Sequence, residues 1–249
     1  VQRIREEGFE VQVIENRENL GFATACNQGF EATSAEFYLL LNPDCRIEDN
    51  AIGRTLRFLR SQERIGVVGC RVLNPDGTLQ RACRRSIPRP AVAFYHFSGL
   101  SRLFPSSPRF AAYNYTYIDP EKSHPVEAVS GSFLMVRQKV VTQTGGLDPQ
   151  FFLYGEDLDF CLRARQAGWS IFYFADARIT HFKRVSSSTD PFRSHFHFYD
   201  AMRIFYRKHF FDEAGPLQRF FVLQGIRLLE RIGYLRLKLK RDPGVGSKN

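Results

Sequence analysis

The sequence predicts an α/β domain in which helices flank a mostly parallel β-sheet. Short apolar segments alternate with helical patterns in the first third of the chain, which is typical of strands joined by crossover helices. The segment 37–42 (FYLLLN) is almost entirely apolar, as expected for a strand covered on both faces. The 249 residues are 43% hydrophobic and 24% charged, a composition that excludes a disordered or fibrous protein.

The first third of the chain follows this alternation element by element. Asp49 or Asn50 can cap the helix that follows, whose apolar residues then share one face. The segment 74–77 (NPDG) predicts a turn, after which 78–84 pairs back antiparallel. The elements predicted up to that turn are a strand over 11–15, a helix over 22–32, a strand over 37–42, a helix after Asp49 or Asn50 and a strand over 65–73.

Residues 85–125 are rich in proline and aromatic residues and have no clear period. A long irregular segment in a compact domain is usually functional, so we expect a loop or lid that faces the substrate. Regular structure is predicted again beyond it. The elements are a strand over 126–137, a helix near 139–144, a break at Gly145 and Gly146, a helix over 156–167, a strand over 170–174, and helices over 194–210 and 217–240.

Charge and cysteine content exclude several classes of protein. Of the formal net charge of +9, residues 216–249 carry +6, so the remainder attracts a nucleic-acid backbone only weakly. Five scattered cysteines without a CxxC pair fit neither a disulfide framework nor a zinc ribbon. No apolar run reaches the about 18 to 20 residues that span a bilayer, and residues 1–10 lack the apolar core of a secretory signal. We therefore expect a cytoplasmic protein that does not bind nucleic acid.

Carboxylates are the main candidates for chemistry, because the GxGxxG, GxxxxGK[ST], HExxH and GxSxG motifs are absent. Asp44 follows the apolar strand directly, at the sheet edge where open α/β folds place ligands. One well-placed carboxylate is enough for Mg²⁺ or Mn²⁺ when substrate phosphates supply further ligands. The alternative is an ordinary turn, since Asn42, Pro43 and Asp44 are also residue types that end strands.

A second acidic cluster, Glu156, Asp157 and Asp159, lies at a predicted helix start. Acids there complement the helix dipole, which is the structural explanation. The functional explanation is that Glu156 or Asp157 is a general base in an aromatic-walled cleft. His181 follows a predicted strand and could bind the metal beside Asp44, or could be a structural histidine. The loop after it, 183–190, could close over the site.

Taken in order, these segments resemble one known family. The matching residues are Asn19-Leu20-Gly21-Phe22-Ala23 with Asn27 and Gly29, Leu40-Leu41-Asn42-Pro43-Asp44, Gly131-Ser132-Phe133-Leu134, Gly145-Gly146-Leu147-Asp148, Phe151-Phe152, Gly155-Glu156-Asp157, Asp159, Cys161-Leu162-Arg163, Gly168-Trp169 and His181. This series, from about residue 11 to 210, resembles glycosyltransferase family 2. Within that family it is most similar to bacterial rhamnosyltransferases that act on lipid-linked glycans.

The resemblance implies a GT-A fold and an inverting, metal-dependent glycosyltransferase of cell-surface polysaccharide synthesis. It implies a nucleotide-sugar donor, dTDP-rhamnose or a UDP-hexose, and a glycan or polyprenyl-linked acceptor. Asp44 and His181 take the metal-binding places, with Mg²⁺ or Mn²⁺ as the cofactor. Asp157 takes the place of the base, and Glu156 beside it that of an acceptor contact or alternative base. The donor-side positions are Asn19, Gly21, Phe22, Asn27, Asn42, Asp44 and Gly131.

One departure from the family concerns the start of the chain. Family members open with a further strand and helix that contact the nucleotide base, whereas this sequence begins just before the second strand. The resemblance therefore implies an N-terminally incomplete catalytic domain over 1–210. A catalytically inactive member that binds sugars or partners is the alternative, and a nucleic-acid-binding protein a more remote one.

Residues 211–249 are expected to form a basic amphipathic helix and tail. The apolar residues of this helix share one stripe beside an arc of arginines and lysines. Such a helix suits an anionic membrane surface, which implies peripheral attachment to the inner face of the cell membrane. The alternative is a helix docked on the protein or on a second copy of it.

Overall fold

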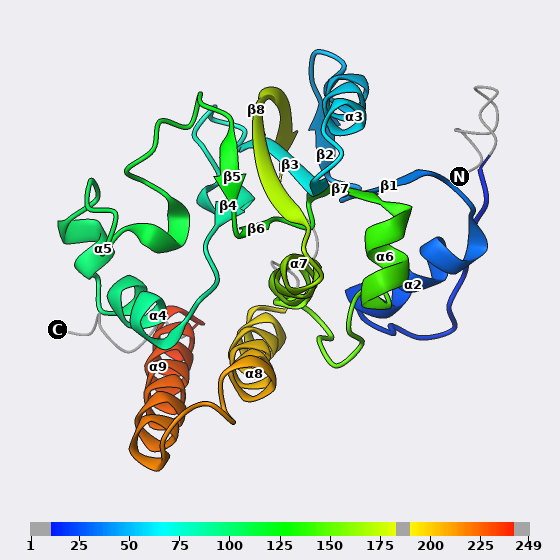
Figure 1. Ribbon diagram of the computed structural model, residues 1–249. Helices are drawn as coiled ribbons and strands as arrows, with labels where there is room; N and C mark the ends of the chain where they lie inside the picture. Colours follow the sequence, from blue (N-terminus) through cyan, green and yellow to red (C-terminus); the bar gives the residue numbers. More distant parts are fainter. Residues whose placement is uncertain (1–10, 183–189, 242–249) are drawn as a thin grey trace, which may run out of the picture.

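A computed structural model describes residues 11–182 and 190–241 of the chain, and its centre is a six-stranded sheet (Figure 1). The strand order is β1-β7-β3-β8-β2, with β5 also paired to β8, while β4 and β6 form a separate two-stranded sheet. The strands are β1 (Phe37–Leu41), β2 (Cys45–Ile47), β3 (Ile65–Leu73), β4 (Arg84–Arg85), β5 (His124–Val126), β6 (Ala128–Val129), β7 (Phe133–Arg137) and β8 (Ser170–His181).

Helices flank the sheet, as the sequence predicts. They are α2 (Phe22–Ala32), α3 (Ala51–Ser61), α4 (Pro90–Phe97), α5 (Leu100–Leu103), α6 (Gln138–Thr144), α7 (Glu156–Gln166), α8 (Pro191–His209) and α9 (Pro216–Arg241). Asn50 caps α3 through its side-chain oxygen, which accepts a bond from the Gly53 amide at 3.3 Å. The segment 85–125 is less irregular than predicted, because α4 and α5 fold within it.

The prediction of a mostly parallel sheet is wrong in detail, because among the described strands only β3 and β8 pair in parallel. β7 lies between β1 and β3 and is antiparallel to both. The three strands β1, β3 and β8 therefore do run the same way, and the inserted β7 runs against them. The sequence predicted one strand over 126–137, but a turn at Ser130–Ser132 divides this segment into the short β6 and the separate strand β7.

The strand predicted over 11–15 does not form. Val13 and Ile14 are 37% and 44% exposed, and residues 11–20 have no regular structure. A strand needs a hydrogen-bonded neighbour, and none of the described strands pairs with this segment. The hairpin predicted after 74–77 is reduced to a single bridge between Leu73 and Leu79, and a 3₁₀ turn at Arg81–Cys83 follows it.

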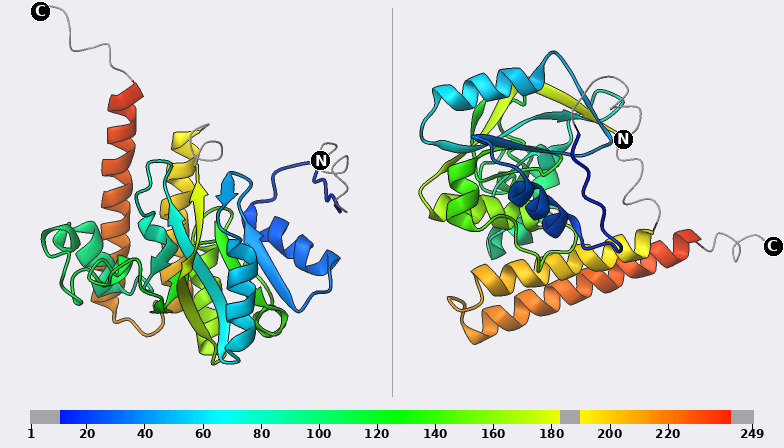
Figure 2. Two further views of the ribbon diagram at one scale, coloured as in Figure 1. Left: turned by 90° about the horizontal axis from the view of Figure 1, so that it is seen from above. Right: turned by 90° about the vertical axis from the view of Figure 1, so that its right-hand side faces the viewer.

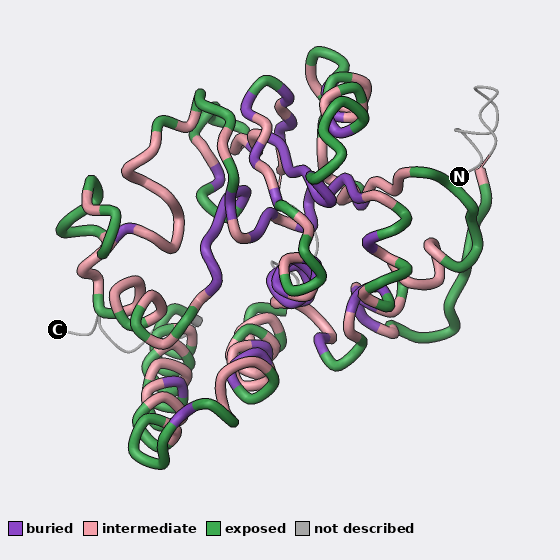
Figure 3. The backbone as a smooth tube through the Cα atoms, viewed as in Figure 1, coloured by how far each residue is buried: buried purple, intermediate pink, exposed green. Residues whose placement is uncertain are grey.

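The two faces of the sheet are covered by different elements, and the core lies between them (Figure 3). On one face α3 places Phe58 in a stack with Phe174, their ring centroids 4.5 Å apart. On the other face, Gly69 of β3 lies so close to β6 that an added Cβ would come within 2.5 Å of Val129. The candidate site lies beyond this packed core, at the C-terminal ends of β1 and β8.

Helices α8 and α9 form an antiparallel hairpin beside the sheet domain (Figure 2). Arg203 of α8 and Glu230 of α9 form an ion pair at 2.7 Å, and Gly233 lies against the His195 ring. The predicted C-terminal helix is therefore docked on the protein along one side. None of the described helices is long and apolar enough to cross a bilayer.

Candidate active site

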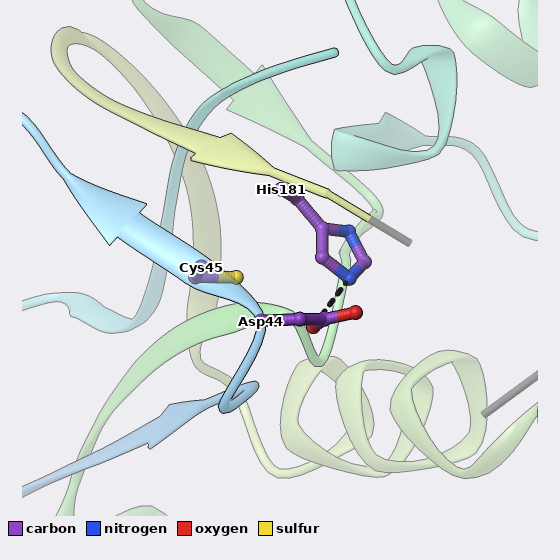
Figure 4. A group of neighbouring side chains, drawn as sticks. All are labelled: Asp44, Cys45 and His181. Carbon is purple, nitrogen blue, oxygen red and sulfur yellow. Dashed lines mark ion pairs between the residues drawn. The ribbon is translucent and has the colours of Figure 1, made fainter. Parts of the chain in front are cut away.

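The pairing of β2 with β8 brings Asp44 and His181 together (Figure 4). Cys45 is opposite His181 in this antiparallel ladder, and the Phe182 amide donates to the Asp44 carbonyl oxygen at 2.9 Å. As a result, Asp44 Oδ1 lies 3.0 Å from His181 Nε2. Two residues that are 137 positions apart in the sequence thus meet, as the metal-site prediction requires.

Gln80 orients the His181 ring, a role that sequence reasoning missed. The buried Gln80 amide nitrogen donates to the His181 carbonyl oxygen at 2.8 Å, so the amide oxygen must face the ring. That oxygen lies 3.0 Å from His181 Nδ1, which must therefore carry a proton and donate. A histidine that ligates a metal through one nitrogen commonly donates from the other in this way.

The facing atoms of Asp44 and His181 fit a shared divalent cation. With the proton on Nδ1, His181 Nε2 and the Asp44 carboxylate present lone pairs to each other at 3.0 Å, and a cation or second ring proton between them relieves the repulsion. Two neighbouring ligands of an octahedral ion, each about 2.1 Å from it, are about 3.0 Å apart. Asn42 lies 3.3 Å from the same ring nitrogen through its amide nitrogen. Carboxylate and imidazole together suit Mn²⁺, and the carboxylate also suits Mg²⁺.

Cys45 completes the group of three potential ligand atoms, which lie within 4.8 Å of one another (Figure 4). Burial, followed by the charge of Asp44, raises the pKa of the Cys45 thiol to about 11. The thiol donates to the Ser132 carbonyl oxygen at 3.6 Å. A protonated, soft sulfur is a poor ligand for Mg²⁺ or Mn²⁺, so Asp44 and His181 are the better donors.

A three-residue turn, Ser130–Ser132, connects this group to the acidic cluster. The Ser132 carbonyl oxygen accepts a hydrogen bond from the Asn42 amide at 3.2 Å. In the same turn, the Gly131 amide donates to Asp157 Oδ2 at 3.0 Å. The two candidate groups therefore lie at the same edge of the sheet, on either side of one turn.

Asp157 is buried in an ion pair that the sequence did not predict. Asp157 lies in the first turn of α7. Its side chain is 12% exposed, and its Oδ2 lies 2.5 Å from Arg85 Nη2. Arg85 also donates to the Val129 carbonyl oxygen at 3.1 Å. The pair fixes the carboxylate beside the Gly131 amide, with its charge compensated by a buried cation.

Glu156 is also buried, but its carboxyl group forms no ion pair with the described residues. Its Oε2 is buried and has no hydrogen-bond partner among the described residues. Burial, followed by the charge of Asp157, raises the pKa of the Glu156 carboxyl from 4.5 to about 8. The Glu156 charge in turn contributes to a raised pKa of Cys26 on α2, after burial. Glu156 and Asp157 thus have different surroundings, one unpaired and the other ion-paired, and different surroundings give the members of a carboxyl pair separate roles.

Asp159, the third acid of the cluster, has a structural role. It is fully buried and lies 2.7 Å from Arg163, 2.7 Å from Lys208 and 2.8 Å from His209. Hydrogen bonds from His209, Lys208 and Arg163 lower the pKa of Asp159 despite its burial. These contacts tie α7 to the end of α8.

The predicted donor-side residues gather around the start of α2. The Phe22 amide donates to the Phe152 carbonyl oxygen at 3.0 Å, and Asn19 accepts from the Gly21 amide at 3.0 Å. An added Cβ on Gly131 would lie 3.4 Å from the Phe22 ring, which places this ring beside Gly131. Asn27 uses its amide nitrogen and oxygen on the backbone of Leu147, at 2.7 and 2.9 Å, so it fixes a loop. Donor contacts of these residues remain predictions.

With this geometry in place, comparison with known proteins decides the family. A family model described as glycosyltransferase-like family 2 matches residues 2–200. The chain belongs to this family. A likeness to the crystal structure of GalNAc-T7 with UDP, GalNAc and Mn²⁺ covers 92% of this chain and 44% of that one, at a TM-score of 0.51 and 14% identity. It confirms the GT-A fold.

Two curated relatives of this chain have names that specify their reactions or pathways. An N-acetylglucosaminyl-diphospho-decaprenol L-rhamnosyltransferase of Mycobacterium tuberculosis is 30% identical over 73% of this chain and 62% of its own length. The low-salt glycan biosynthesis hexosyltransferase Agl10 of Haloferax volcanii is 27% identical over 65% of this chain and 48% of its own. The chain thus spans about half to two thirds of the length of these relatives.

Proposed function

We propose that this protein transfers a sugar from a nucleoside-diphosphate donor to an acceptor hydroxyl, with inversion at the anomeric carbon. The observation that carries the proposal is the turn Ser130–Ser132, which contacts the Asp44 group on one side and Asp157 on the other. Inverting transfer needs a group that offsets charge on the leaving diphosphate and a base on the opposite face of the sugar. Both candidates are available at this edge of the sheet.

Asp44 and His181 are the residues that would hold a divalent ion. When bound, Mg²⁺ or Mn²⁺ would offset the negative charge that develops on the leaving diphosphate. The 3.0 Å separation of Asp44 Oδ1 and His181 Nε2 supports this assignment, and so does the Gln80 bond that holds the Nδ1 side of the ring and turns Nε2 toward Asp44.

Asp157 is the proposed general base. Arg85 and the Gly131 amide hold its Oδ2, while Glu156 retains its proton near neutral pH because its pKa is raised to about 8. A protonated Glu156 can donate to an acceptor oxygen but cannot accept the acceptor's proton. This difference favours Asp157 as base, with Glu156 as acceptor contact.

The proposed donor is dTDP-rhamnose, with a UDP-hexose as the second choice. The proposed acceptor is a glycan carried on a polyprenyl diphosphate, in the synthesis of a cell-surface polysaccharide. The name of the Mycobacterium tuberculosis relative supports a rhamnosyl donor and a lipid-linked acceptor.

We further propose that 1–210 is the catalytic part and that the tail, 211–249, attaches the protein to the inner face of the cell membrane. Helix α9 exposes several large apolar residues. These are Leu217, Phe220, Phe221, Leu228, Tyr234, Leu235 and Leu239. Arginines and lysines of the same helix are exposed beside them, which suits anionic lipid.

The transfer proposal is tested with the purified protein, labelled dTDP-rhamnose or UDP-glucose, and a short-chain polyprenyl-diphosphate N-acetylglucosamine acceptor. Product is expected with Mn²⁺ or Mg²⁺ and not with EDTA. Metal-dependent donor binding without any product would instead identify an inactive family member.

Membrane attachment is tested by vesicle sedimentation. The variant Phe221→Glu/Leu235→Glu should pellet less with anionic vesicles than the wild type does, and equal pelleting of the two would contradict membrane attachment through α9.

A further inference from the structure

A separate polar cavity lies mainly within residues 85–125, the segment that the sequence predicted as a loop or lid. It has a volume of about 190 Å³, several times the roughly 30 Å³ of one water molecule in the liquid. Its lining residues come from the 3₁₀ turn Arg81–Cys83, from α4 and α5, and from the segment around the 3₁₀ turn Ala112–Asn114. The polar residues that line it, here called the arginine pocket, are Arg81, His96, Ser101, Arg102, Asn114 and Thr116.

The positive charge of the arginine pocket is not compensated. No acidic residue lines it, and Arg81 and Arg102 form no ion pair or side-chain hydrogen bond with any residue in 11–182 or 190–241. Neighbouring arginines differ in this respect. Arg85 is paired with Asp157, and Arg89 is paired with Glu127. The pocket thus brings together two exposed guanidinium groups that no described side chain neutralises.

His96 also lines the cavity, and one of its ring nitrogens is unpaired. Its Nδ1 is buried and has no hydrogen-bond partner among the described residues. Burial, followed by the charges of Arg102 and Arg81, lowers the pKa of His96. Buried polar atoms in proteins are normally paired, so this nitrogen is an incompletely satisfied part of the pocket wall. Each positive neighbour favours a negatively charged ligand.

The arginine pocket is also connected to the candidate base. The His96 ring lies 4.6 Å from the Tyr113 ring, centroid to centroid. The Tyr113 side chain is near enough to Arg85 for the guanidinium charge to act on its hydroxyl, and Arg85 Nη2 lies 2.5 Å from Asp157 Oδ2. The pocket is therefore separated from Asp157 by one aromatic ring and one guanidinium. Asp44 and His181, the proposed holders of the donor diphosphate, are not part of it.

We propose that the arginine pocket binds a phosphate or diphosphate group. Guanidinium groups donate in a planar fork that matches phosphate oxygens, and the hydroxyl and amide groups of Ser101, Thr116 and Asn114 can serve the remaining oxygens. Two sources share this chemistry. One is the diphosphate of a lipid-linked acceptor, which rests on the proposed function, and the other is a free inorganic anion.

The first test measures binding of sodium pyrophosphate to the whole protein by calorimetry in EDTA, so that Asp44 and His181 cannot contribute through a metal ion. Arg81→Gln/Arg102→Gln should weaken binding about 100-fold, since each lost charged hydrogen-bonding group is worth roughly tenfold. The matched control is Arg54→Gln/Arg57→Gln on α3, which removes two exposed arginines and should bind like the wild type. Equal affinity of the wild type and the pocket variant would overturn the proposal, as would no binding to the wild type.

The second test distinguishes the two sources. If the acceptor diphosphate is the ligand, the pocket variant raises the KM for a polyprenyl-diphosphate acceptor about 100-fold and leaves the donor KM unchanged. If a free anion is the ligand, the acceptor KM is unchanged although pyrophosphate binding is lost. Absence of transfer by the wild type would refute the proposed function, while the calorimetry would still decide the pocket.

Discussion

Glu156→Gln should stabilise the protein in a pH-dependent way. The Glu156 carboxyl is 7% exposed, and its pKa is raised from 4.5 to about 8 by burial and then by Asp157. Between these two pH values the folded protein holds a proton that the unfolded chain has released, so stability falls as the pH rises and levels off above about 8. At about 1.4 kcal/mol for each pH unit, the loss reaches an upper limit of roughly 5 kcal/mol.

Glutamine keeps the shape of the side chain and cannot ionise. The Glu156→Gln variant should match the wild type within about 1 kcal/mol near pH 4.5 and exceed it by several kcal/mol at pH 8.5. Urea unfolding followed by circular dichroism measures both free energies of unfolding at each pH. Glu63→Gln, at an exposed residue, is the control and should show no such trend. A constant difference between wild type and Glu156→Gln over this range would refute the reasoning.

Three further predictions concern other parts of the site. Gln80→Leu should weaken Mn²⁺ binding about 10- to 100-fold in calorimetry, because the ring orientation is lost, and unchanged affinity would contradict this. Gly21→Ala should lower the free energy of unfolding by about 2 to 4 kcal/mol in urea titration, since Gly21 has φ +85° and an added Cβ would be 2.7 Å from a backbone oxygen. Its control, Gly29→Ala, meets nothing within 4 Å and should stabilise α2. Asp157→Asn should reduce transfer about 10²- to 10⁴-fold with donor affinity retained, and equal loss of both would indicate a structural role.

The local periodicity of the sequence predicted much of the framework. The helix over 22–32 and the strand over 65–73 have the predicted bounds, because their apolar patterns agree with their final burial. The strand over 11–15 failed because a strand pattern specifies no partner, and none of the described strands pairs with it. The position of β7 between β1 and β3, antiparallel to both, is a long-range pairing that periodicity does not report.

The candidate site was predictable only for residues with a local signal. Asp44 follows an apolar strand and Asp157 begins a helix, so both positions stand out in the sequence. Arg85 and Gln80 act on partners 72 and 101 residues away, and their own segments have no regular pattern. Their roles follow from long-range packing, which a single sequence does not encode in any local motif.

The short strand β2 gives the proposed ion a mechanical consequence. β2 has three residues, lies at the edge of the sheet and is held there by pairing with the end of β8. A ligand shared by Asp44 and His181 would act as a non-covalent cross-link across this margin. At 100 times its dissociation constant it would add about 2.7 kcal/mol to the stability of the native state. By the same linkage, a substitution that weakens the pairing of β2 with β8 would lower the affinity of Asp44 and His181 for the ion.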